Sequence, residues 1–185
     1  LKPTIKDHMI QQKKEELSTL VGSFMSTIES LHQLEVKGEL SRAVAQERAI
    51  RIIMSVRYGE KGKDYAWVSD YDARLIAHPY RNELLGQSLW DYTDPDGVLV
   101  FRRFSLDSQK TGEAFLTYRW QLHDDKNQVV PKLSLVKRYE PWGWIVGTGV
   151  YIEDIERESR EISRSILILG WSMLSFILAL FGVSS

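Results

Sequence analysis

The stretch that decides the fold is Pro141-Trp142-Gly143-Trp144-Ile145-Val146-Gly147-Thr148-Gly149-Val150-Tyr151, in the last third of the chain. Aromatic and β-branched residues at this density are typical of a strand, so we predict a strand over residues 143–151. Its glycines carry no side chain, and we expect them to let neighbouring groups pack closely on its backbone. The preceding Glu140-Pro141 pair predicts a short connection from another strand.

The residues upstream predict the rest of a small sheet. Apolar and polar residues alternate in several short runs, and the predicted strands are 65–69, 74–78, 113–122, 131–139 and 143–151. A polar loop, His123-Asp124-Asp125-Lys126-Asn127, is expected between the third and fourth strands. Short connections favour antiparallel pairing. The predicted fold class is therefore α+β, with helices packed on a five-stranded antiparallel sheet.

Helices are expected on both sides of the first strands. The predicted helices span residues 3–35, 42–57 and about 98–108. Apolar residues recur every seven positions from Ile10 to Leu31, which predicts a first helix about 50 Å long whose first turns project beyond the body. Gly38 is expected to end this helix, and Ser41 is a suitable N-cap for the second.

The chain ends in a run from Ser165 to Ser185 that contains no Asp, Glu, Lys or Arg. A helix needs roughly 20 mostly apolar residues to span a membrane, so we predict a C-terminal transmembrane helix and a membrane as partner. The alternative is a buried C-terminal helix of the globular body.

Composition excludes several classes of function. With 24 basic and 25 acidic residues the net charge is −1, so no field of one sign favours nucleic acid as a partner. Cysteine is absent, which excludes disulfides, thiol catalysis and thiolate metal sites. No nucleophile elbow, zinc-type His spacing or phosphate loop occurs. We therefore expect no enzyme activity, no metal and no cofactor in this chain.

The order of the motifs resembles the single Cache (sCache) family of extracytoplasmic sensor domains, which are built on a PAS-like sheet. The residues that carry the resemblance lie between about positions 60 and 155: Tyr65-Ala66-Trp67-Val68, His78-Pro79, Asp94-Pro95-Asp96-Gly97, Pro131-Lys132-Leu133-Ser134 and the 141–151 stretch. Each motif alone is weak. Together, in this order and followed by an apolar helix, they are specific.

The resemblance implies a place and a role. Members of the family sit outside the cytoplasmic membrane in bacterial or archaeal receptors, whose output modules are chemoreceptor signalling domains, histidine kinases or cyclic-dinucleotide enzymes. Many bind small carboxylates such as acetate, propionate, pyruvate or lactate. The implied organisation is a long N-terminal helix (1–35), a Cache-type ligand-binding body (36–155) and a juxtamembrane and transmembrane helix (156–185). Because the chain starts at Leu1, an earlier membrane helix is expected before it.

The charges beside the apolar run favour the opposite orientation. Arg157, Arg160 and Arg164 precede the run, and positive charge usually marks the cytoplasmic side. Three glutamates are interleaved with these arginines and weaken the signal. We follow the resemblance, and expect a receptor of the inner membrane whose body lies in the periplasm or outside the cell.

Strand alternation predicts a site for a small carboxylate. Tyr65 and Trp67 share one face of the first strand, and the aromatic pair at 118 and 120 shares a face of the third. A buried carboxylate needs a cation or several donors. Lys132 would supply the cation, and His78 would donate a hydrogen bond and titrate near neutrality. The candidate ligand-binding residues are Tyr65, Trp67, His78, Tyr118, Trp120, Lys132 and Ser134, with Trp90 as a lid.

Each candidate has a structural alternative. The tryptophans are common core residues, Lys132 has the alternative of an exposed strand lysine, and His78 that of a satisfied turn residue. The whole domain has an alternative as well, a ligand-free structural or dimerisation module of a membrane receptor. In either case we expect a homodimer formed through the helix at 3–35.

Overall fold

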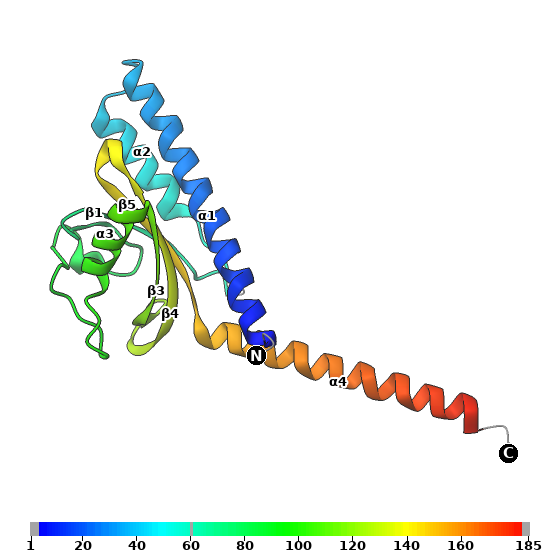
Figure 1. The fold of residues 1–185 in the computed structure, drawn as a ribbon. Coiled ribbons are helices and arrows are strands. Elements are labelled where there is room, and N and C mark those ends of the chain that lie inside the picture. The colour runs from blue at the N-terminus through cyan, green and yellow to red at the C-terminus, as the bar shows by residue number, and fades with distance from the viewer. Residues whose placement is uncertain (1–3, 60, 183–185) are drawn as a thin grey trace.

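Five strands form one antiparallel sheet, as predicted, and the structure shows their order to be β2-β1-β5-β4-β3 (Figure 1). The structure, a computed structural model, describes residues 4–59 and 61–182. The main elements are α1 (Ile5–Val36), α2 (Arg42–Ser55), β1 (Ala66–Asp70), β2 (Leu75–Ala77), α3 (Val100–Thr111), β3 (Glu113–Leu122), β4 (Asp125–Tyr139), β5 (Trp144–Tyr151) and α4 (Ile152–Gly182). Short 3-10 turns occupy Asn82–Leu84 and Glu140–Trp142.

The two N-terminal helices begin and end where their capping residues dictate. Thr4 and Asp7 form a reciprocal capping box at the start of α1, and Gly38 just past its end has a φ of 75°. Ser41 caps α2 by accepting a hydrogen bond from the backbone N–H of Val44 at 3.3 Å. The predicted long helix and the predicted N-cap are both confirmed.

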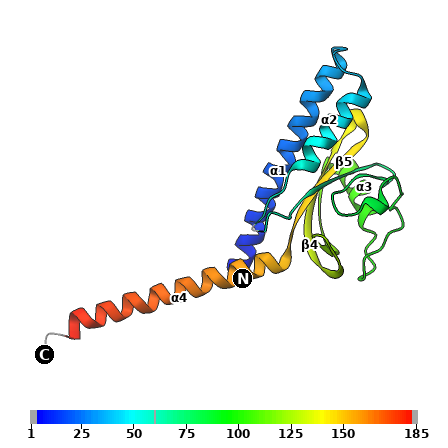
Figure 2. The same cartoon turned by 180° about the vertical axis from the view of Figure 1, so that it is seen from behind.

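Helices cover the two faces of the sheet with different groups of side chains. α1 and α2 lie on one face, and α3 with the irregular segment before it lies on the other (Figures 1 and 2). Strand alternation divides β1 accordingly. Ala66 and Val68 pack under α1 and α2, whereas Tyr65, just before the strand, and Trp67 pack under α3.

Two glycines of β5 make room for neighbouring side chains, which confirms the expectation of close packing. A Cβ placed on Gly147 would lie 2.4 Å from Cζ2 of Trp67, and one on Gly149 would lie 2.2 Å from Oγ of Ser134. β5 is the central strand, so these side chains cross its backbone in the middle of the sheet. On its α3 side, β5 therefore presents bare backbone at Gly147 and Gly149, between the side chains of Ile145 and Tyr151.

The predicted polar loop at residues 123–127 is wrong in extent. β3 ends at Leu122 and β4 already begins at Asp125, so only two residues form the turn. One of them, His123, has a φ of 50° and is buried, because its ring is paired with a buried carboxylate described below. The other polar residues of this segment are exposed or half-buried, so His123 is the exception among them.

α4 follows β5 without an intervening residue and leaves the body as a long arm (Figure 1). Its first turns pair with the start of α1, through Lys6–Glu156 at 2.6 Å and Lys13–Glu158 at 3.2 Å. The first turns of α1 therefore contact α4. The prediction that they project beyond the body without a contact is wrong.

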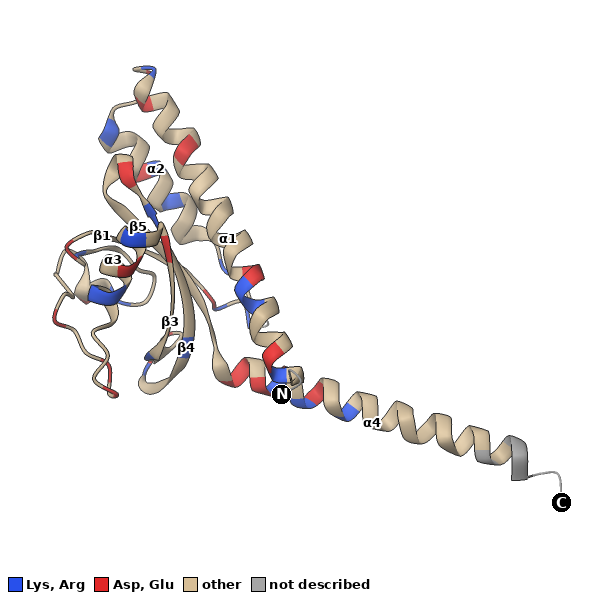
Figure 3. Ribbon diagram, viewed as in Figure 1, with Lys and Arg blue, Asp and Glu red and all other residues tan. Residues whose placement is uncertain are grey.

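The prediction of a transmembrane helix at residues 165–185 is not borne out by the described part of α4. The acidic and basic residues of α4 lie in its first half (Figure 3). Among the residues that the structure describes, no helix combines the length and apolar character that crossing a membrane requires. Residues 183–185 of the predicted run lie outside the described residues.

Candidate functional site

Lys132 is the centre of the candidate site. It lies on the α3 side of β4, is 1% exposed, and its ammonium group is surrounded by aromatic rings. Nζ is 4.0 Å from the ring centre of Tyr65, 5.0 Å from that of Tyr151 and 5.4 Å from that of Trp67. Ring faces attract a cation, but they do not neutralise its charge.

The charge of Lys132 has no ion-pair partner among the described residues. Burial therefore lowers the pKa of this amine from 10.5 to about 7, and the carboxylate of Asp64 only partly opposes that effect. A buried cation without a partner is costly. An anion brought next to Nζ would remove much of that cost.

Two further donors around Lys132 lack partners. The hydroxyl of Tyr65 and Nε1 of Trp67 are both buried without a hydrogen bond to any described group. Buried polar atoms are hydrogen-bonded in the large majority of cases, so two such atoms beside one buried ammonium are unusual. The cluster therefore offers one cation and two free donors, which suits a ligand that carries oxygen atoms.

His78 reaches the same cluster from the end of β2. Its ring lies 4.8 Å from that of Tyr65 and 6.0 Å from that of Trp120. Nδ1 accepts a hydrogen bond from the backbone N–H of Tyr80 at 3.0 Å, so the proton of the neutral ring is on Nε2, free to donate.

The expectation that His78 titrates near neutrality is wrong. Burial lowers its pKa well below the ordinary value, and the positive charges of Lys132 and Arg81 lower it further. His78 is therefore a neutral donor at neutral pH.

The remaining candidates are also brought together, except for Trp90. The hydroxyl of Tyr118 and Oγ of Ser134 are 3.2 Å apart and both buried, and the Trp120 ring lies 6.2 Å from that of Tyr118. Trp90 is half-buried at the edge of the cluster, where the guanidinium of Arg102 lies 5.4 Å from its ring centre. Seven of the eight candidates thus share one buried cluster between the sheet and the 78–112 segment, and Trp90 lies at its rim.

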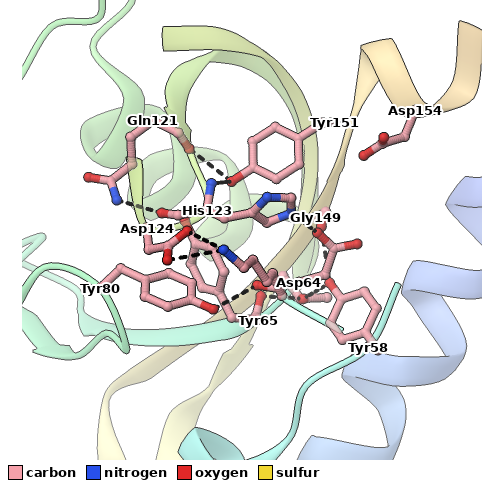
Figure 4. Close-up of polar contacts among 12 residues, drawn as sticks. Tyr58, Asp64, Tyr65, Tyr80, Gln121, His123, Asp124, Gly149, Tyr151 and Asp154 are labelled. Carbon is pink, nitrogen blue, oxygen red and sulfur yellow. Dashed lines mark hydrogen bonds and ion pairs between the residues drawn. The ribbon is translucent and has the colours of Figure 1, made fainter. Parts of the chain in front are cut away.

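A second polar group adjoins the cluster (Figure 4). Nε2 of His123 and Oδ1 of Asp64 are 3.0 Å apart, and both residues are buried. Tyr151 joins this group, because its hydroxyl accepts from the backbone N–H of His123 and donates to the carbonyl of Gln121, both at 2.8 Å. The same Tyr151 ring contacts Lys132, so Tyr151 belongs both to the Asp64–His123 group and to the cluster around Lys132.

Sequence reasoning missed these three residues as functional candidates. Asp64 and His123 stand 59 positions apart, and nothing local signals that they pair. Tyr151 was within reach, since it ends the quoted strand and faces Lys132 in the register of β4 and β5. Arg81 was missed as well; its guanidinium lies 5.3 Å from the ring centre of Trp120 and donates to Oε1 of Gln121 at 3.1 Å.

Comparison with known proteins places this geometry in a family. The family model described as Single Cache domain 2 matches residues 9–165. The methyl-accepting chemotaxis protein McpP of Pseudomonas putida is 31% identical over 162 residues, which is 88% of this chain and 29% of McpP. The sensor histidine kinase MctS of Rhizobium johnstonii is 32% identical over 156 residues, 84% of this chain and 32% of MctS. The chain thus spans about a third of the length of these curated relatives.

Two solved structures share the fold over nearly their whole length. One, described as "Periplasmic sensor domain of chemotaxis protein", has a TM-score of 0.74 and 33% identity, and covers 77% of this chain and 97% of its own. The other is described as "Structural basis for carboxylic acid recognition by a Cache chemosensory domain". It has a TM-score of 0.73 and 32% identity, with coverage of 78% of this chain and 97% of its own.

Proposed function

Because the chain belongs to the single Cache domain 2 family of sensor domains, we propose that it is the extracytoplasmic ligand-sensing domain of a transmembrane receptor, a chemoreceptor or a sensor kinase. Its ligand is a small carboxylate such as acetate, propionate, pyruvate or lactate. Lys132 carries this proposal, as a buried cation without an ion-pair partner among the described residues.

The comparisons support the receptor part of the proposal. One curated relative is a chemotaxis protein and another a sensor histidine kinase, and a solved structure with 33% identity is a periplasmic sensor domain. Reporter fusions placed after Tyr151 test the location. We expect activity of an alkaline phosphatase fusion and none of a cytoplasmic reporter; the reverse pattern would favour the side indicated by the arginines before the apolar run.

The chemistry of the cluster supports the ligand part. A carboxylate beside Nζ gains a charge-assisted hydrogen bond, and the Tyr65 hydroxyl and the Nε2–H of His78 offer further donors. Tyr118 and Trp120 are packed against α3, so the apolar part of a ligand held among these rings must be short. A ligand of two to four carbons fits this description.

A titration of the purified chain tests the proposal directly. Isothermal titration calorimetry with acetate, propionate, butyrate, pyruvate and lactate should give binding by at least one of these acids, and glycine amide serves as a small cationic control. Thermal shift provides a second readout, since a ligand at 100 times its Kd stabilises by about 2.7 kcal/mol. Absence of binding by every acid would contradict the ligand assignment.

One observation favours the alternative of a ligand-free dimerisation module. Seven candidate residues are fully buried in this structure, as ordinary core residues would be. In that case Lys132 is simply a buried lysine, none of the acids binds, and the role of the domain is to join two chains through α1. The calorimetric titration separates the two functions.

A further inference from the structure

The buried Asp64–His123 pair lies beside Tyr65 and Tyr151 (Figure 4), whose rings both contact the Lys132 ammonium. Asp64 directly precedes Tyr65, whose ring centre is 4.0 Å from Nζ. The ring of His123 is 4.7 Å from that of Tyr151, whose centre is 5.0 Å from Nζ. The two tyrosine rings that contact the ammonium thus also adjoin the carboxylate pair.

The position of Asp64 is built to hold a carboxylate. Gly59 has a φ of 76°, and a Cβ there would lie 2.2 Å from Oδ2 of Asp64, so the backbone leaves this space to the carboxylate. His123 bonds the other oxygen. The charge of Asp64 favours the protonated amine of Lys132, and the charge of Lys132 favours the ionised carboxyl, while burial opposes both.

We propose that Asp64 is a positioning residue of the ligand site: held by His123, its carboxylate keeps the Lys132 amine protonated and so sets the pH range over which the site captures a carboxylate. This inference rests on the proposed carboxylate-sensing function. Asp64 touches no ligand in this account and acts through Lys132.

The other titratable groups around the two charges do not compete for this role. They come from five elements and connections: Tyr58, Tyr65, His78, Tyr118, Tyr151 and Asp154. Burial raises the pKa of each tyrosine and lowers that of His78, so these side chains stay neutral at neutral pH. Asp154, in the first turn of α4, raises the pKa of Asp64 by its like charge.

On its other side Asp64 borders a cavity of about 170 Å³ between α1 and α4. There Lys13 bridges Glu16 and Glu158, both at 3.2 Å, and Arg157 pairs with Asp154 at 2.9 Å, so the charged groups that line this cavity with Asp64 are already paired with one another. Asp64 therefore acts on Lys132 from the cavity side, where the other charged side chains are engaged in ion pairs of their own.

The proposal has a specific consequence for binding. A carboxylate favours the protonated form of Lys132, so above the pKa of the free site binding requires the uptake of a proton, and affinity falls about tenfold for each further pH unit. Below that pKa the affinity is independent of pH. A plot of affinity against pH therefore bends at the pKa of the Lys132 amine. Removing the charge of Asp64 lowers that pKa, so the bend moves to lower pH.

The test is a calorimetric pH profile from pH 5.5 to 8.5 on the purified chain, with whichever of acetate, propionate, pyruvate and lactate binds the parent most tightly. Asp64→Asn keeps the shape and removes the charge. We expect its bend to move acid by roughly one pH unit, while its affinity at pH 5.5 equals or exceeds that of the parent. Asp124→Asn is the matched control, because Asp124 is exposed, pairs with Lys63 at 2.9 Å, and should keep the parent profile.

Two results would overturn the inference: a bend at the parent's position in Asp64→Asn, or an affinity lowered equally at every pH, as a merely structural role predicts. If Asp64→Asn does not fold, His123→Gln decides. It retains the carboxylate, so no acid shift is expected, and an acid shift would assign the effect to the imidazole. Failure of the proposed function is distinct: the parent then binds none of the four acids, or Lys132→Met binds as the parent does at pH 5.5.

Discussion

Lys132 on β4 and Tyr151 on β5 stand opposite each other in register, and Nζ of the lysine lies 5.0 Å from the centre of the tyrosine ring. Tyr151 is the last residue of β5, and α4 begins at the next position. The lysine at the centre of the proposed ligand site thus contacts the residue that joins the sheet to α4.

Replacing Lys132 should abolish the proposed binding. Lys132→Met removes the ammonium but keeps much of the side-chain volume, and the lost charge-assisted hydrogen bond contributes about 1.5–3 kcal/mol. We therefore expect at least a tenfold weaker affinity by calorimetry. Lys126→Met is the control, since Lys126 is exposed and pairs with Glu83 at 2.7 Å. Equal affinities of parent and Lys132→Met would remove Lys132 from the site.

The same lysine should make folding stability depend on pH in the absence of ligand. Its folded pKa of about 7 lies below the value of 10.5 expected for the unfolded chain. Between these values the unfolded chain binds more protons, so the free energy of unfolding rises with pH from about 7 towards 10. Urea unfolding at pH 6.5, 7.5, 8.5 and 9.5 should show this rise in the parent. In Lys132→Met the rise should be absent and the stability at pH 6.5 higher; parallel curves for the two proteins would contradict the expectation.

The aromatic walls should set the length of acid that is accepted. Trp120→Phe enlarges the cluster without removing Lys132, so butyrate and valerate should gain affinity relative to acetate. Trp142→Phe is the matched control, because Trp142 packs on the opposite face of the sheet and its Nε1 donates to Glu35 at 2.7 Å. An unchanged ranking of acids in Trp120→Phe would show that this ring does not line the ligand.

The bare backbone of β5 should be intolerant of a methyl group. Gly147→Ala places a Cβ 2.4 Å from the Trp67 ring, which must move, and overpacking of this kind costs about 1–3 kcal/mol. Gly22→Ala in α1 meets nothing within 4 Å and should be neutral or stabilising by up to about 1 kcal/mol. Thermal unfolding of the two variants checks the contrast, and equal Tm values would show that Trp67 is not fixed over Gly147.

The expected homodimer can be tested by cysteine cross-linking, because the chain contains no cysteine. Ser23→Cys and Ser26→Cys introduce thiols at exposed positions of α1. If α1 forms the interface, mild oxidation should give disulfide-linked dimers of one or both. Arg51→Cys, exposed on α2, is the control. If only Arg51→Cys gave disulfide-linked dimers, the interface would lie at α2 and not at α1.

Local pattern predicted the sheet and the membership of the cluster well. The bounds of β3 match the predicted 113–122, and alternation correctly assigned Tyr65 and Trp67 to one face. Residue type and the two-residue period predict the strands and their faces, because side chains alternate between a face that helices cover and a face of different surroundings.

Contacts between distant segments could not be predicted in the same way. The sequence around His123 predicted only a polar loop, whereas the structure buries the His123 side chain against Asp64. The ring cage of Lys132 depends on the register of β4 and β5, which no local pattern specifies. The neutral state of His78 could not be predicted either, because it depends on burial and on two cations that are distant in the sequence.

The direct junction of β5 and α4 has a mechanical consequence. With no loop between them, a change in the position of Tyr151 passes directly into the first turns of α4, which the Lys6–Glu156 and Lys13–Glu158 pairs hold against α1. Its 31 residues make an arm of about 46 Å. A tilt of about 3° at the base would carry the far end by roughly 2.4 Å for an arm of that length. A change at Tyr151 that tilted α4 by this small angle would thus appear at the far end of the helix as a displacement of ångström size.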